Sequence, residues 1–209
     1  MRKKYKRMLK VLIFLIGVVL ILMVAYRFLK KDNDEAIIKV LDSINNYNYT
    51  LDERDSSLMK DTYNELKKTL KEKEIDYEEY AKLLAKLFVI DLFTMNNKVN
   101  KYDVGSLEYV YPSAQENFQI NVEDTIYKTI ENNSNGKRRQ ELPVVKSVNI
   151  TSIDEATYTI NEVELESFII NLTWNYEKNL GYDNKATITV VKENNKLYVV
   201  SYKVGDVSE

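Results

Sequence analysis

The sequence predicts an α+β fold preceded by a membrane-spanning helix, and three observations along the chain support this. An apolar run occupies the N-terminal region, and apolar residues at helical spacing dominate as far as about residue 132. Alternation with a period of two takes over from about residue 144. Helices followed by antiparallel strands are typical of α+β domains. We therefore expect an N-terminal transmembrane helix, a helical stalk, and then helices packed in a curved antiparallel sheet.

The apolar run extends from Met8 to Leu29, which is long enough to cross a bilayer as a helix of about 20 residues. Six basic residues precede its uninterrupted part, three follow it closely, and no acidic residue lies before residue 30. This bias places the N-terminus in the cytoplasm and the body of the chain outside. A cleaved signal peptide is the alternative, although the run is long for one and the best site, near Ala25, lacks a small-x-small pattern.

The residues after the run predict a helical stalk. Helix-start chemistry at Asp32 to Asp34 is followed by apolar residues at helical spacing, and this pattern fades near Asn45. A second helix is expected from about Asp55 to Lys73. It is mostly charged and has only a narrow apolar stripe, so we expect a solvated helix, with a short coiled-coil contact as the alternative. The expected organisation is a cytoplasmic basic tail over residues 1–7, a transmembrane anchor over 8–29, a helical stalk over 30–75 and an extracytoplasmic α+β domain over 76–209.

A buried helix is expected to begin at Asp76, where Glu79 three residues later completes a capping-box pattern. The helix continues to about Asn96 and is apolar nearly all round, which is typical of a helix at the centre of a domain. Asp91 lies within it. We expect this carboxylate at the edge of the helix or paired with a cation, and a functional role is the alternative.

A loop-rich passage follows, with Gly105 and Pro112 as its breakers. A short helix is expected around residues 114–118 and a longer one over 122–132. Tyrosines of the passage are expected to cover the mouth of the core, or alternatively to line a pocket. These tyrosines are Tyr102, Tyr109 and Tyr111.

The C-terminal part predicts strands over residues 144–153, 156–160, 165–176, 186–191 and 196–204. Residues 165–176 alternate most clearly and place one set of apolar side chains on a single face. This set is Phe168, Ile170, Leu172, Trp174 and Tyr176. We expect three long antiparallel strands at the end of the domain, preceded by a shorter strand or hairpin.

Composition argues against most catalytic and nucleic-acid-binding functions. The chain has no cysteine and no histidine, so thiol, Ser-His-Asp and Cys-based zinc chemistry are excluded. From residue 30 onward it carries 23 basic and 32 acidic residues, a net charge of −9, which opposes binding to phosphate backbones. Its five glycines form no phosphate-binding loop. We therefore predict no enzyme, no cofactor, no metal site and no nucleic-acid partner.

Two side-chain groups are kept as candidates. Asp91, Asp103 and Glu108 could converge in space, and a catalytic role would then need their pKa values to be pushed apart by burial. The other group, Lys137 to Arg139, is the only basic cluster of an acidic domain. We expect it to form a solvated turn or salt bridges, with docking to an acidic partner as the alternative.

The order of these elements resembles the nuclear-transport-factor-2-like cone, through the segments DYEEYAKLLAKLFVIDLF and the terminal strands. In particular it is similar to membrane-anchored assembly components of type IV secretion and conjugation systems, and to single-pass envelope proteins of low-GC Gram-positive bacteria. The resemblance covers about residues 76–204 and implies a scaffold that binds other envelope proteins, with homo-oligomerisation left open. The alternative is a binding module that holds a small apolar or peptide ligand in the cone, between Trp174, Tyr102, Tyr109 and the buried helix.

Overall fold

The computed structural model describes residues 5, 8, 14–23 and 39–205. Half of the predicted anchor over residues 8–29 (residues 9–13 and 24–29), the basic tail apart from residue 5, and the first part of the stalk lie outside the described residues. Residues 14–23 are helical, with exposed apolar side chains. Within the described ranges, no helix combines the length and the apolar character that crossing a membrane requires. Residues 38–209 form one compact unit, which carries all the elements described below.

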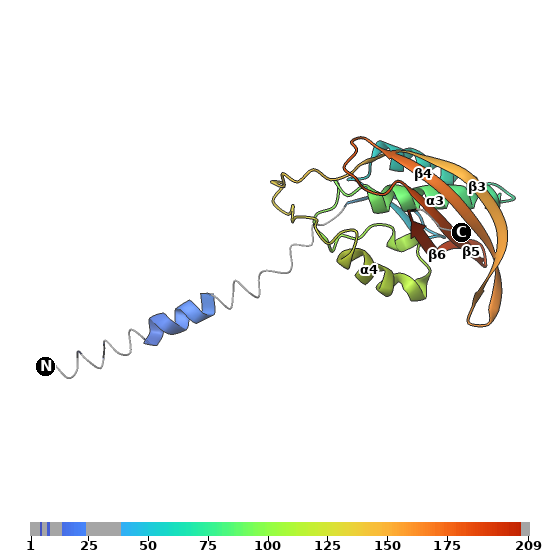
Figure 1. Cartoon of the computed structure of the whole chain (residues 1–209). Coiled ribbons are helices and arrows are strands. Elements are labelled where there is room, and N and C mark those ends of the chain that lie inside the picture. Colours follow the sequence, from blue (N-terminus) through green and yellow to red (C-terminus); the bar gives the residue numbers. More distant parts are fainter. Residues whose placement is uncertain (1–4, 6–7, 9–13, 24–38, 206–209) are drawn as a thin grey trace. The chain divides into compact units, whose positions relative to one another are not determined.

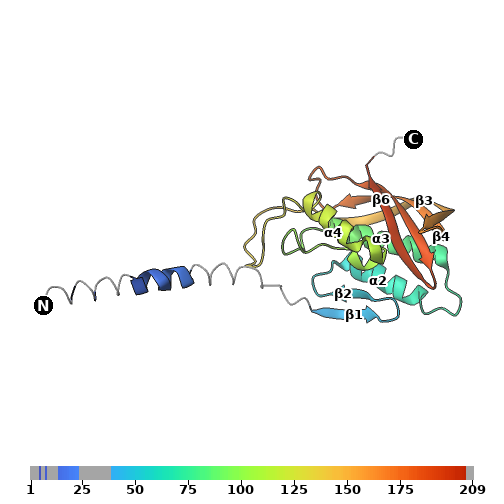
Figure 2. The ribbon, with the colours of Figure 1, turned by 90° about the horizontal axis from the view of Figure 1, so that it is seen from below.

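The helices lie in the first two thirds of this unit. After a hairpin of β1 (Val40–Ile44) and β2 (Tyr49–Asp52) come α2 (Ser57–Thr69) and α3 (Tyr77–Phe93). Two short 3-10 helices, η1 (Leu107–Tyr109) and η2 (Pro112–Ala114), lead into α4 (Gln115–Asp124). Figure 2 shows α2 beside the β1–β2 hairpin.

The rest of the unit is an antiparallel sheet in the order β3-β4-β5-β6. Its strands are β3 (Val145–Ile160), β4 (Val163–Tyr176), β5 (Lys185–Glu193) and β6 (Lys196–Val204). Every connection joins neighbours in the sheet, so β3 and β6 form its two edges. The sheet curves around α3, and the β3–β4 hairpin continues past the shorter strands (Figure 1). The expected α+β fold with a curved antiparallel sheet is confirmed.

The core lies between α3 and the concave face of the sheet. Asp76 caps α3 by accepting a hydrogen bond from the backbone N–H of Glu79 at 3.0 Å, as the capping pattern predicts. The helix is buried on nearly all sides, and the ring of Phe93 lies 4.7 Å from that of Trp174 on β4. Phe168, Ile170, Leu172 and Trp174 are all buried, which confirms the predicted inward face.

The predicted stalk is wrong over its described part. Residues 40–44 form strand β1 instead of a helix, because they pair with β2 rather than continuing a helical repeat. The second stalk helix exists as α2, but it is not a solvated rod. It buries Met59, Tyr63 and Leu66 in the same core as α3.

Two other boundaries differ from the prediction. The helix expected over residues 122–132 is absent, since α4 ends at Asp124 and turns follow it. The hydroxyl of Tyr127 donates to the backbone oxygen of Leu92 at 2.8 Å, which draws this segment onto α3. The two strands expected before residue 160 are one, β3, because Asp154 and Glu155, between the two expected strands, pair with Ile169 and Phe168 of β4 without a break.

Candidate functional site

The three carboxylates that the sequence singled out do lie in one place. Asp91 from α3, Asp103 from the loop after it, and Glu108 from η1 all line a cleft of about 260 Å³. The residues before α2 form the opposite wall, with Asp52, Arg54 and Asp55. The cleft therefore combines five carboxylates with two cations, Arg54 and Lys98.

Asp91 is held by the chain itself. One of its oxygens lies 2.5 Å from the ammonium of Lys98, whose side chain is 6% exposed, and the other accepts the backbone N–H of Ser106. Gly105 is required here, because a Cβ at this position would lie 2.8 Å from the backbone oxygen of Asp91. This confirms the expectation of a carboxylate paired with a cation, and it anchors the loop over residues 97–108 on α3.

Asp103 and Arg54 form the second internal pair. The guanidinium contacts both carboxylate oxygens of Asp103, at 2.6 and 3.4 Å, and the backbone N–H of Val99 donates to the same group at 2.8 Å. Burial alone would raise the pKa of Asp103, but these charge-assisted bonds lower it below its ordinary value. Arg54 therefore joins the segment before α2 to the same loop.

For two further carboxyl groups of the cleft, Glu108 and Asp55, the pKa is shifted in the opposite direction. Burial raises the pKa of Glu108 to about 7, although Thr50 on β2 donates to it from both its backbone N–H and its hydroxyl. Burial likewise raises the pKa of Asp55 to about 6, with one hydrogen bond from the backbone N–H of Asp52 at 2.7 Å. These two groups exchange protons near neutral pH, whereas Asp103 stays ionised.

The cleft contains two carboxyl groups, those of Glu108 and Asp55, that are able to take up and release protons near neutral pH, but most of its polar groups already have partners in the chain. No group of three or more carboxylates within the described ranges is arranged to hold a metal ion. The main effect of the contacts is mechanical, since they tie β2, α2, α3 and η1 together through residues 97–108. Sequence reasoning identified three of its five acids and missed Asp52 and Asp55, whose only signal is their position beside Arg54.

The aromatic residues proposed for a ligand site in the cone do not form one. Trp174 is 1% exposed and packs on Phe93, and Tyr109, the last residue of η1, is fully buried with its ring 5.3 Å from that of Tyr49. Tyr102 is 63% exposed, with Lys101 over its ring. Tyr111 donates to Glu193 at 2.8 Å and is half-buried at the end of β5. The space beside α3 is thus filled by side chains of the chain.

The basic cluster is partly structural. Arg138 donates to the backbone oxygens of Asn96 at 2.7 Å and Lys98 at 2.8 Å, so it fastens its loop to the segment after α3. Lys137 and Arg139 are exposed. This arrangement fits the expected solvated turn.

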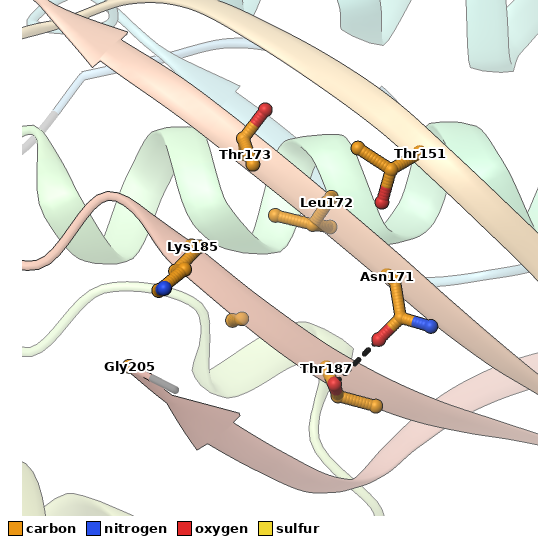
Figure 3. Close-up of a pocket in the computed structure, with 8 residues that line it drawn as sticks. Thr151, Asn171, Leu172, Thr173, Lys185, Thr187 and Gly205 are labelled. Atoms are coloured by element: carbon orange, nitrogen blue, oxygen red, sulfur yellow. Dashed lines mark hydrogen bonds between the residues drawn. The ribbon is translucent and has the colours of Figure 1, made fainter. Parts of the chain in front are cut away.

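A shallow polar site lies on the outer face of the sheet, with a volume of about 210 Å³ (Figure 3). Asn171 and Thr187 lie next to each other at one side of this site. The hydroxyl of Thr187 donates to the amide oxygen of Asn171 at 2.5 Å, and the amide nitrogen donates to Ser152 at 2.9 Å. These hydrogen bonds join side chains of β3, β4 and β5 across the outer face of the sheet.

The free edge of β3 is a feature that sequence reasoning missed. β3 ends the sheet, and no other strand in the described part of the chain pairs with its outer side. A signal for it was present: residues 147–177 contain six acidic residues and neither lysine nor arginine. The acids cluster around the β3–β4 turn, where Asp154, Glu155, Glu162 and Glu164 are all exposed.

Comparison with known protein families, curated proteins and solved structures finds no match to this chain.

Proposed function

We propose that the chain is a single-pass, membrane-anchored interaction protein that binds other envelope proteins through the free edge of its sheet. In this proposal residues 8–29 are the anchor, the N-terminus is cytoplasmic and the α+β unit lies outside the membrane. The role is that of a scaffold, not an enzyme. The finer expectations of a nuclear-transport-factor-2-like cone and of a place in a secretion or conjugation assembly belong to this proposal and rest on the resemblance of the sequence.

The observation that carries the proposal is the exposed edge strand β3. A sheet edge offers a row of backbone N–H and C=O groups that pair readily with another chain. β3 has 16 residues, and its far half extends beyond the helices, so this half buries few of its side chains. This half of the strand adds little buried surface to the core of its own domain, and pairing with a strand of another protein would explain its length.

The interior of the unit supports the same choice. The alternative, a module that holds a small apolar or peptide ligand in the cone, requires space between Trp174, Tyr109 and α3. Both side chains are buried by neighbours from the same chain. Binding at the surface therefore has better support than binding within the cone.

The absence of cysteine from the chain allows a direct test. Thr157, exposed on β3, and Glu116, exposed on α4, are each replaced in the full-length protein, as Thr157→Cys and Glu116→Cys. Intact cells are treated with a membrane-impermeant maleimide that carries a photo-crosslinker. We expect both positions to be labelled, because both would lie outside, and we expect defined protein adducts from Thr157→Cys only.

Protection of both cysteines in intact cells, with labelling after lysis, would contradict the external location. Equal crosslinking from both positions, or no adduct from Thr157→Cys, would contradict binding through the β3 edge. Mass spectrometry of the adduct identifies the partner and shows whether it belongs to the envelope.

A further inference from the structure

The free edge is most regular over its last nine residues, 152–160. The irregularities in the β3–β4 pairing lie before this segment, between Val145 and Ser147 and between Ile150 and Ser152. From Ser152 to Ile160 the register with β4 is continuous. In an antiparallel edge strand, alternate residues direct both backbone groups away from the sheet. This segment therefore presents an unbroken ladder with no partner in the described part of the chain.

The charged side chains of this segment and of the turn after it are all acidic. Asp154 pairs with Ile169 and Glu155 with Phe168, so the two carboxylates point to opposite faces of the hairpin. Glu162 and Glu164 add two more at the turn and on β4. None of these four carboxylates forms an ion pair with any residue that the structure describes, whereas Glu166 nearby is paired with Lys192 at 2.8 Å. Both faces of the free edge thus carry unpaired negative charge.

We propose that residues 152–160 accept an extended, basic segment of a partner protein, which adds to the sheet as a strand beside β3. This inference rests on the proposed function and names the chemical class of the partner. Lysine or arginine side chains at successive positions of the added strand would reach Asp154 on one face and Glu155 on the other. Backbone pairing supplies the affinity, and the carboxylates select the sign of the partner's charge.

The same charges disfavour a second copy of this chain as the occupant. Pairing two β3 edges would bring together two segments that both lack lysine and arginine over residues 147–177. Charged residues on edge strands also oppose self-association in general. If these carboxylates only prevented self-pairing, a basic strand would not bind. The experiment below distinguishes that role from recognition of a basic partner.

The test uses the full chain purified in a mild non-ionic detergent. The probe is a fluorescent peptide as long as the 152–160 segment, in which pairs of adjacent lysines are separated by threonine or valine, so that both faces of the added strand carry lysine. Two matched peptides serve as controls: one with glutamate in place of lysine, and one with the lysines kept but successive backbone nitrogens methylated. Binding is measured by fluorescence anisotropy at low and high salt.

The protein variant is Asp154→Lys/Glu155→Lys, and its matched control is Glu65→Lys/Glu116→Lys, two exposed acids on α2 and α4. Both variants change the net charge equally. We expect the lysine peptide to bind the native chain and the control, and to bind the Asp154→Lys/Glu155→Lys variant at least tenfold more weakly. The glutamate peptide should bind only that variant, and higher salt should weaken every complex. The methylated peptide should not bind, because it lacks the donors of a strand.

Several results would overturn the inference. Equal loss in both variants, or binding of the methylated peptide, would reduce the effect to general charge attraction. Absence of binding by the lysine peptide would leave the carboxylates as protection only. Dimerisation of the native chain that depends on Asp154 and Glu155 would make a second copy the occupant. If Thr157→Cys still yields an envelope adduct in any of these cases, the proposed function stands and only the basic strand is rejected.

Discussion

The two edges of the sheet are built in different ways. The β6 edge is covered by tyrosines from distant parts of the chain. The backbone N–H of Leu197 donates to the hydroxyl of Tyr80 at 3.2 Å, and the hydroxyl of Tyr49 donates to the Leu197 oxygen at 3.0 Å. Further along, the backbone N–H of Tyr111 donates to the oxygen of Val199 at 3.0 Å. The backbone N–H and oxygen of Leu197 and the backbone oxygen of Val199 are therefore bonded inside the fold.

The β3 edge has no such cover over residues 152–160. Its protection from indiscriminate pairing is the charge of Asp154 and Glu155, which works through solvent-exposed groups. The contrast teaches that the β6 edge contributes to the stability of the fold, whereas the outer side of β3 pairs with no other strand in the described part of the chain. Three measurements test this difference, beginning with the one for which we expect the largest effect.

Replacing a tyrosine should be costly at the covered edge and mild at the free edge. Tyr49 is fully buried, and Tyr49→Ala removes its ring packing together with its hydrogen bonds. We expect the free energy of unfolding to fall by about 3–5 kcal/mol. Tyr158→Ala on β3, where the side chain is 36% exposed, should cost less than about 1 kcal/mol. Urea denaturation measures both, and similar losses would remove the distinction between the edges.

The side of the fold next to the covered β6 edge should also give the free energy of unfolding a pH dependence, which the free β3 edge should not. Glu108 bonds to Thr50 on β2 and has a pKa raised to about 7 by burial. Because the folded state holds this proton more tightly than the unfolded state, the free energy of unfolding should fall as pH rises from about 4.5 to 7. The loss should be on the order of 2 kcal/mol, and Asp55 adds to it in the same direction up to pH about 6.

Glu108→Gln should flatten this part of the stability profile, while Glu65→Gln, on the exposed face of α2, should leave it unchanged. Asp103 does not contribute to the change in the free energy of unfolding over this pH range. Its pKa is lowered, so its contribution is already complete above the ordinary carboxyl range. Urea denaturation at intervals from pH 4.5 to 8 provides the test, and an identical slope in Glu108→Gln would contradict the assignment.

The smallest expected effect isolates a single hydroxyl. Tyr80→Phe keeps the ring but removes the group that bonds to the Leu197 N–H and to the Tyr49 hydroxyl at 2.6 Å. We expect a loss of about 1–2 kcal/mol and faster hydrogen exchange at Leu197. Tyr158→Phe should change neither quantity measurably. Unchanged exchange at Leu197 would show that β6 does not depend on this tyrosine.

Local patterns were sufficient where an element is stabilised mainly by its own residues. The cap at Asp76 and the all-round apolar character of the following helix predicted α3, and alternation from Phe168 to Trp174 predicted the inward face of β4. The sequence left open that Asp91, Asp103 and Glu108 converge, and in the structure all three line one cleft. Their pairing could not be predicted in full, because Arg54 comes from a segment that the sequence placed in a stalk.

Local patterns failed where distant contacts decide the conformation. The spacing of Leu41 and Ile44 suits a helix, but Tyr49 contacts Tyr80 and Leu197, and this draws residues 40–52 into a hairpin beside the core. The segment after α4 has helical spacing too, yet the bond from Tyr127 to Leu92 holds it as a series of turns. In both cases tertiary packing outweighs a weak local preference.

By itself, the sequence determined the α+β class, the central helix, the partition of charge along the chain and the acidic character of residues 147–177. These are properties of composition and of short-range periodicity. Only the tertiary structure decided that Asp154 and Glu155 lie on a free edge and that Glu108 and Asp55 share a cleft. The reason is physical: which strand edge is covered depends on tyrosines more than a hundred residues away from it, and burial shifts a pKa only once the chain has folded around the group.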